Sequence, residues 1–318
     1  MGFKGSVSSC RRVIRRLGFR WRRSKDNRKI LIERHDIRSK RLKYLREIRQ
    51  YREEGRPIVY VDETYIHSTH TSSHAWDDDL NKTLHSPVGK GPRAIIVHGG
   101  GERGFVDNAL LMFKSGRKTG DYHHEMNTEN FEKWSSEKLI PNLPPRTVVV
   151  VDNASYHNVQ LNRAPTSGAT SAEMKRWLAE KNITYPPSSL KPDLYDLIKT
   201  HKPSHIKYKI DNIFEAAGHT VLRLPPYHPD LNPIEMIWGT VKNCVGQKNV
   251  TFKLDDAMRL AQDKFESISS KECIPYVNKV KAREEEYFSE EAGIDARTEN
   301  LVISTEDSDD SEPSDDDE

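Results

Sequence analysis

The sequence predicts an α/β protein built around a mixed sheet, and three observations lead to this fold class. Apolar runs rich in strand-forming residues occupy 58–61, 148–151 and 221–224. A Gly-rich stretch at 99–104 separates two further strand-like runs, which is typical of an antiparallel pair. Amphipathic helical segments are interspersed with these strands, an order that favours a sheet flanked by helices.

The valine run at 148–151 is expected inside the sheet rather than at its edge. β-Branched residues in a row disfavour a helix, because each side chain loses rotamer freedom against the preceding turn. A strand that is apolar on both faces is typical of a central position in a mixed or parallel sheet.

Helices are predicted from the spacing of apolar side chains and from capping residues. The predicted helices cover 6–17, 36–54, a segment after a cap at Asn127 or Thr128, a segment from Asn232, and 254–287. Three short amphipathic segments punctuated by prolines indicate a helical insertion at about 159–219. The acidic, Ser-rich end, 299–318, is too polar to bury a core and is expected to be disordered.

The net charge of +2 conceals a strong segregation of charge along the chain. Residues 1–60 hold 20 Lys/Arg and 6 Asp/Glu, a net charge of +14. Residues 299–318 hold 10 Asp/Glu and no Lys/Arg, so the 238 residues between sum to −2. The basic arm suggests contact with a polyanion. The alternative is a basic helix face that is simply solvated.

Composition excludes several classes of protein. No apolar run approaches the roughly 20 residues that a membrane-spanning helix needs, so no membrane partner is expected. The start of the chain does not have the apolar centre of a secretory signal. Cys10, Cys244 and Cys273 are scattered and form neither a disulfide framework nor a zinc motif, which favours a reducing compartment.

Two predicted strands end in an aspartate, Asp62 and Asp152. Ligands of open α/β sheets gather at the carboxyl ends of strands, so parallel neighbours would direct both carboxylates into one crevice. Two close carboxylates repel each other unless a cation lies between them, and Mg²⁺ prefers such oxygen ligands. The alternative is that each Asp merely begins a turn after its strand.

Glu235 is the candidate third carboxylate. It lies at the third position of a helix that begins with Asn232 as cap and Pro233 as first residue. A glutamate at this position also completes a capping box, which is the structural alternative. However, Glu235 flanks the apolar stripe of the helix, where its side chain can face the edge of the sheet.

Three sequence blocks resemble the catalytic blocks of the mariner superfamily of transposases. The blocks read YVDETYIH, VVVVDNASYHNVQ and LPPYHPDLNPIEMIWGTVK, and the resemblance covers roughly residues 57–250. It implies a ribonuclease-H-like fold in which Asp62, Asp152 and Glu235 form a DDE triad that binds two Mg²⁺ or Mn²⁺ ions. The long gap between Asp152 and Glu235 departs from most such enzymes and is attributed to the helical insertion at 159–219.

The resemblance also implies a function and a domain organisation. The expected reaction is metal-dependent hydrolysis of DNA followed by strand transfer, carried out by a homodimer on transposon ends and target DNA in the nucleus. The expected domains are 1–20, a remnant of a helix-turn-helix module; 21–56, a basic linker and helix; 57–290, the catalytic domain; and 291–318, an acidic disordered tail. Candidate DNA-binding residues lie in the basic arm: Arg11, Arg12, Arg15, Arg16, Arg22 and Arg23.

Other polar residues lie beside the three acids. Glu63 is expected on the opposite face of its strand from Asp62 and is not assigned to the metal. His157 and His228 are either close to a phosphate or leaving group, or satisfied by loop backbone, and the second interpretation is favoured. Asn153 and Tyr156 are expected to shape their loop.

Three alternative functions stay open at this point. The first is a domesticated, catalytically inactive transposase-derived DNA-binding protein, which the shortened front end allows. The second is a structure-specific metal-dependent nuclease of the same fold. The third is a scaffold whose acidic tail binds basic proteins. The sequence does not indicate the target site or the terminal repeats.

Overall fold

The protein is described by a computed structural model that covers residues 35–71, 89–116, 118–119, 122–123 and 126–306. The chain divides into two compact units, residues 1–39 and 40–318, and the fold below is that of the second. The predicted helix at 6–17 and the six candidate DNA-binding arginines lie outside the described residues.

The elements follow one another in the order that the sequence predicts. The strands are β1 (Ile58–His67), β2 (Arg93–Gly101), β3 (Gly104–Phe105), β4 (Leu111–Lys114), β5 (Lys118–Thr119), β6 (Tyr122–His123), β7 (Val148–Val151) and β8 (Thr220–Arg223). The helices are α2 (His35–Glu53), α3 (Thr128–Trp134), α4 (Ser171–Glu180), α5 (Lys191–His201), α6 (Lys209–Ala216), α7 (Pro233–Lys248), α8 (Leu254–Ser267) and α9 (Ser270–Glu306). Asn127 caps α3, and its side chain accepts a hydrogen bond from the Asn130 amide at 2.8 Å.

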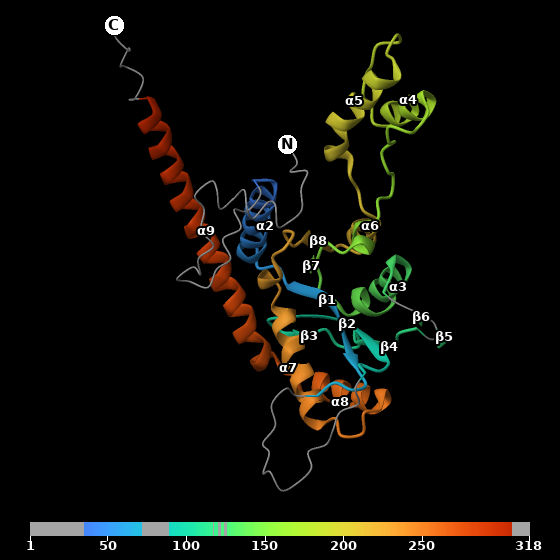
Figure 1. The fold of residues 1–318 in the computed structure, drawn as a ribbon, viewed down its shortest axis with the longest axis vertical. Helices are drawn as coiled ribbons and strands as arrows, with labels where there is room; N and C mark the ends of the chain where they lie inside the picture. Colours follow the sequence, from blue (N-terminus) through green and yellow to red (C-terminus); the bar gives the residue numbers. More distant parts are fainter. Residues whose placement is uncertain (1–34, 72–88, 117, 120–121, 124–125, 307–318) are drawn as a thin grey trace, which may run out of the picture. The chain divides into compact units, whose positions relative to one another are not determined.

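The main sheet is mixed, as predicted. Its strands lie in the order β3-β2-β1-β7-β8, and β4 also pairs with β2. β1 is antiparallel to β2 but parallel to β7, and β7 is parallel to β8. The carboxyl ends of β1, β7 and β8 therefore meet at one edge of the sheet (Figure 1).

The valines of β7 are fully buried because they face two separate cores. All four have 0% of their surface exposed, and alternate valines belong to different clusters. One core contains Leu45, Trp238 and Phe265 from α2, α7 and α8. The other contains Phe131 and Phe214 from α3 and α6. Burial of each valine stabilises the fold by roughly 1.5–3 kcal/mol, so the central position of β7 follows from its composition.

The Gly-rich stretch differs from the prediction, because four of its six residues belong to strands rather than to a turn. Residues 99–101 belong to β2 and pair with 59–61 of β1. The turn is confined to Glu102 and Arg103, between β2 and β3. A Cβ at Gly101 would lie 2.4 Å from the Ile58 carbonyl oxygen, so close approach of the two backbones requires glycine here.

The predicted insertion is helical, but it is shorter than 159–219. Helices α4 and α5 form a small core of their own around Met174, Trp177 and Ile198. In contrast, Ile210 and Phe214 of α6 pack in a core of the main sheet. The predicted third amphipathic segment therefore belongs to the main body, because its apolar stripe covers the sheet.

The prediction that the tail is disordered from residue 291 is wrong for the residues up to 306, which are helical. Helix α9 continues to Glu306, far beyond the predicted end at 287, and only 307–318 lie outside the described residues. The error arose because a helical backbone does not need an apolar stripe throughout its length. No helix in the described ranges is both long enough and apolar enough to cross a membrane.

Buried His98 predicts a specific loss of stability in acid. Its ring stacks on Phe105 at 4.3 Å between centroids, and burial lowers the pKa of His98 to about 3. The unfolded chain binds a proton at His98 below about pH 6.5 but the folded chain does not, so stability falls as pH falls below that value. We expect a loss of about 2 kcal/mol between pH 7 and pH 5 from this residue.

Urea unfolding of wild type and His98→Gln at both pH values measures this contribution. The variant, which cannot take up the proton, is expected to lose less of its unfolding free energy on acidification. Equal losses in both proteins would contradict the assignment.

Candidate active site

Asp62 is held inside the protein on β1. The strand alternates, so Tyr60 and Asp62 face the core that contains Trp238 whereas Val61 and Glu63 face the other side. Only 7% of Asp62 is exposed, and the Trp238 indole Nε1 donates a hydrogen bond to its Oδ2 at 2.9 Å. Burial raises the pKa of Asp62 well above its usual value, and the negative charges of Glu63 and Glu235 raise it further.

Asp152 directly follows the central strand β7. The parallel register pairs Tyr60 with Val150, and its continuation by two residues brings Asp152 level with Asp62. The Asp152 Oδ1 accepts hydrogen bonds from the Ala154 amide at 2.9 Å and faces the His157 Nδ1 at 2.7 Å. Burial opposes ionisation of Asp152, but these two hydrogen bonds outweigh it and lower its pKa.

Glu235 reaches the same edge of the sheet from helix α7. The apolar stripe of this helix is buried as predicted and fixes its orientation, whereas Glu235 itself is exposed. The Asn232 side chain caps the helix by accepting a hydrogen bond from the Ile234 amide at 3.3 Å. In a capping box the carboxylate at the third helical position also accepts a hydrogen bond from the backbone N–H of the cap residue. Helix α4 has this second bond, whereas α7 has only the bond to the Asn232 side chain, so the Glu235 carboxylate is not used for capping.

All three predicted acids line one cavity. Its volume is about 520 Å³, and its remaining lining comes from residues 153–154 and from the loop between β8 and α7. That loop exposes Tyr227, whose surface is 86% accessible, at the rim of the cavity. The structure therefore brings Asp62, Asp152 and Glu235 together, although they are far apart in the sequence.

The donor set suits a hard divalent cation. Three carboxylates offer only oxygen ligands, and the influence of Glu235 on the pKa of Asp62 shows that their charges already interact. Within the described residues, however, no three His, Cys, Asp or Glu side chains are close enough to hold an ion as they stand. In this conformation the Asp62 carboxylate accepts a hydrogen bond from Trp238, and the Asp152 carboxylate contacts His157.

The position of His157 differs from both sequence interpretations. It is buried, and its two ring nitrogens face carboxylates: Nδ1 faces Asp152 at 2.7 Å and Nε2 faces Glu63 at 3.3 Å. Burial lowers the pKa of His157, but these two carboxylates outweigh burial and raise it to about 9. His157 therefore positions Asp152. Glu63 lies on the opposite face of β1 from Asp62, as predicted, and its carboxylate contacts the other ring nitrogen of His157.

The other neighbours of the acids have structural partners. The Asn153 side chain donates a hydrogen bond to the Leu224 carbonyl, which confirms that it shapes its loop. Burial raises the pKa of Tyr156, and the negative charge of Glu63 raises it further. His228 lines the cavity, with its Nδ1 3.5 Å from Asp230 and its ring edge-on to Tyr287.

Arg223 is a positioning residue that the sequence did not indicate. It lies on β8 and donates to both carboxylate oxygens of Asp211, at 2.7 and 2.9 Å. It also donates to the Asn158 side chain and to the His157 carbonyl, at 2.9 and 3.0 Å. Arg223 thereby fixes the turn 155–158 that carries His157. Only the tertiary structure reveals this, because Arg223 and its partners come from three separate segments.

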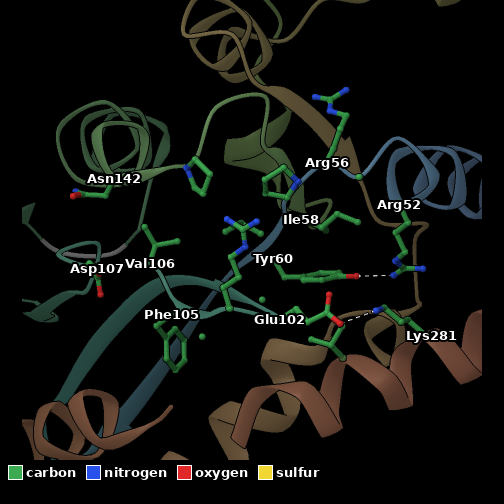
Figure 2. Close-up of a pocket in the computed structure, with 18 residues that line it drawn as sticks. Arg52, Arg56, Ile58, Tyr60, Glu102, Phe105, Val106, Asp107, Asn142 and Lys281 are labelled. Carbon is green, nitrogen blue, oxygen red and sulfur yellow. Dashed lines mark hydrogen bonds and ion pairs between the residues drawn. The ribbon is translucent and has the colours of Figure 1, made fainter. Parts of the chain in front are cut away.

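A second cavity, of about 470 Å³, lies at the amino end of β1, beside the turn between β2 and β3 (Figure 2). Two of its charged side chains, Lys281 and Glu102, form an ion pair. Lys281 bonds to Glu102 at 2.9 Å, and Arg52 donates to the Tyr60 hydroxyl at 3.1 Å. Arg52 also bonds to Glu284 of α9. These contacts link α9 and α2 to the sheet.

Comparison with known proteins identifies the family of this chain and solved structures that are similar to it. Residues 57–259 match the model of a family described as DDE superfamily endonuclease. No curated protein matches the chain. The structure is similar to the Mos1 transposase paired-end complex with left transposon end, with 13% identity, a TM-score of 0.51, and 89% of this chain and 70% of that chain covered.

Further solved structures of the same transposase show weaker similarity. The Mos1 strand transfer complex is 15% identical, with a TM-score of 0.49 and with 89% of this chain and 69% of that chain covered. The mariner Mos1 paired end complex with Mg is 15% identical, with a TM-score of 0.49 and with 87% and 68% covered. Together with the strand order, the similarity to the paired-end complex with left transposon end confirms the predicted ribonuclease-H-like fold.

Proposed function

Because the chain belongs to the family of DDE superfamily endonucleases, we propose that it is a mariner-type transposase that cuts and joins DNA with divalent metal ions. The observation that carries this proposal is the cavity that Asp62, Asp152 and Glu235 share at the carboxyl ends of parallel strands. Two carboxylates in such a place favour a cation between them, and a third completes an all-oxygen ligand set.

The three acids would hold two Mg²⁺ or Mn²⁺ ions. When bound, such ions activate a water or a 3′-hydroxyl as nucleophile and stabilise the leaving oxygen of the phosphodiester. The chain's own residues position the ligands: Trp238 holds Asp62, His157 holds Asp152, and Asn232 begins the helix that carries Glu235. No Ser or Cys nucleophile is needed, because the attacking oxygen comes from water or DNA.

The substrates and assembly follow from the same proposal. The DNA substrates are the ends of the transposable element and the target, bound by a homodimer in the nucleus. The basic arm at 1–60, with its net charge of +14, supplies phosphate contacts, including those of the six candidate arginines. An open cavity with an exposed Glu235 favours an active enzyme over an inactive DNA-binding descendant.

Replacing Glu235 by Gln tests the proposed function. The amide retains the shape of the side chain but loses the charge that attracts a cation, so we expect at least about a hundredfold loss of Mg²⁺-dependent nicking. The measurement is nicking and strand transfer of DNA that carries the ends of the element, with Mg²⁺, with Mn²⁺ and with EDTA.

Glu137→Gln is the matched control, because this glutamate is also exposed but lies on the π-helical turn after α3. The control is expected to keep wild-type activity. Nicking that persists in EDTA, or that is equal in Glu235→Gln and wild type, would contradict the proposal. Nicking without strand transfer would identify a nuclease instead.

A further inference from the structure

The segment between β7 and β8 folds as a small module on a narrow neck. Its helices α4 and α5 share their own core, which includes Met174, Leu178 and Leu194. The neck consists of the outgoing segment 159–161 and the returning segment 207–209. Two backbone hydrogen bonds of 2.9 Å join these segments, from the Leu161 amide to the Lys207 carbonyl and from the Lys209 amide to the Val159 carbonyl. The module therefore spans residues 160–209.

The neck of this module is anchored to the strands that carry the active site. It leaves the sheet just after the turn 155–158, which holds Asp152, and returns through α6 to β8. Arg223 on β8 bonds to Asn158 on one side of the neck and to Asp211 on the other. Its guanidinium also stacks on the Tyr208 ring at 4.0 Å. The base of the module is thus fixed at the catalytic edge of the sheet.

The charge of the module is opposite to that of the rest of the catalytic domain. Residues 160–209 hold 9 Lys/Arg and 4 Asp/Glu, a net charge of +5. Since residues 57–290, the expected catalytic domain, sum to −1, the part of this domain outside the module sums to −6. A polyanion would be repelled by most of this domain and attracted by the module.

The cations of the module are available for a partner, whereas most of its acids are not. Of the module's lysines and arginines, all of which lie in the described residues, only Lys199 has an ion pair, with Asp196 at 2.9 Å. Glu173 and Asp193 accept backbone hydrogen bonds at the starts of α4 and α5, at 2.7 and 2.9 Å. Exposed cations without an ion pair in this part of the structure are Arg163, Arg176, Lys191, Lys202, Lys207 and Lys209.

We propose that this module binds the sugar-phosphate backbone of duplex DNA as it extends from the active-site cavity. The inference rests on the proposed function, because it takes DNA as the substrate. Lysines with flexible stems that are spread over a surface suit a row of phosphates. An interface with a protein would need an apolar centre, and the exposed large apolar residues of the module are Leu161 and Leu190.

A charge-neutralised module tests the inference. The variant replaces Arg163, Arg176, Lys202 and Lys207 by Gln, and its matched control replaces Lys248, Lys253, Lys271 and Lys279, which are also exposed but lie outside the module. Binding of the full chain to a labelled duplex carrying an element end is measured by fluorescence anisotropy in EDTA, at several salt concentrations. Thermal unfolding of both variants checks that each is folded.

We expect the module variant to bind at least about tenfold more weakly at low salt. The slope of log affinity against log salt is expected to fall by about 0.9 for each phosphate that the variant no longer neutralises. Binding is not abolished, because the basic arm remains. The control variant is expected to bind as wild type does.

Three outcomes decide whether the module binds DNA. Equal affinity and salt dependence of the module variant and the control would overturn the inference. Competition by poly-glutamate as strong as that by unlabelled duplex would also overturn it, because the module would then bind acidic polymers in general. Weaker binding by the module variant, in a protein that never nicks DNA with Mg²⁺, would support the inference while the proposed function failed.

Discussion

Replacement of Asp152 by Asn is expected to reduce Mg²⁺-dependent nicking by about a thousandfold or more. Asp152 lies at the end of the central strand, and its low pKa keeps it ionised at neutral pH. The amide would keep the size of the side chain but remove the negative charge that holds a cation. Loss of several kcal/mol of transition-state stabilisation corresponds to this factor. The measurement is the single-turnover nicking rate.

The matched control for this variant is Asp263→Asn, since Asp263 is an exposed aspartate on α8. It is expected to nick DNA at the wild-type rate. Because Asp152→Asn keeps a carbonyl oxygen for the Ala154 amide but loses the ion pair with His157, thermal unfolding of the variant checks that it is folded. Nicking within threefold of wild type, roughly 0.6 kcal/mol, would remove Asp152 from the mechanism.

Truncation of Glu284 to Ala is expected to lower the free energy of unfolding by about 3–5 kcal/mol. Glu284 is only 4% exposed, and it accepts hydrogen bonds from both terminal nitrogens of Arg52, one of them at 2.9 Å. Its loss leaves a half-buried guanidinium without its anionic partner beneath α9. Chemical denaturation of wild type and variant measures the difference.

The adjacent residue provides the control for this prediction. Glu285 pairs with Arg49 at 2.6 Å, but these side chains are 69% and 46% exposed. Glu285→Ala is therefore expected to cost less than about 1 kcal/mol. The double replacement Arg52→Met with Glu284→Leu is expected to recover most of the lost stability, because no unpaired charge then remains. Equal effects of the two single truncations would contradict the buried-pair interpretation.

The features that sequence predicted well are those that local composition determines. The valines of β7 could occupy only a strand buried on both faces, and strand periodicity placed Glu63 opposite Asp62. The cap at Asn232 and the apolar stripe after it oriented α7, and so Glu235, correctly. The three blocks that carry the acids could be recognised because each is a contiguous run.

The features that sequence missed depend on contacts between distant segments. The orientation of His157 depends on a short 3₁₀ turn that Arg223 holds from another strand. The assignment of α6 to the main body depends on which of two cores its apolar stripe meets. Similarly, helical periodicity could not separate the two halves of the segment 159–219, because both are amphipathic.

The three acids at one edge of the sheet are proposed to hold divalent cations together, and every catalytic prediction depends on this. Anomalous X-ray diffraction from crystals of the protein soaked in Mn²⁺ tests it most directly. We predict anomalous peaks in the cavity, with carboxylate oxygens of Asp62, Asp152 and Glu235 about 2.1 Å from a metal ion. Peaks that contact fewer than two of these acids, or a cavity without a peak at saturating Mn²⁺, would contradict it.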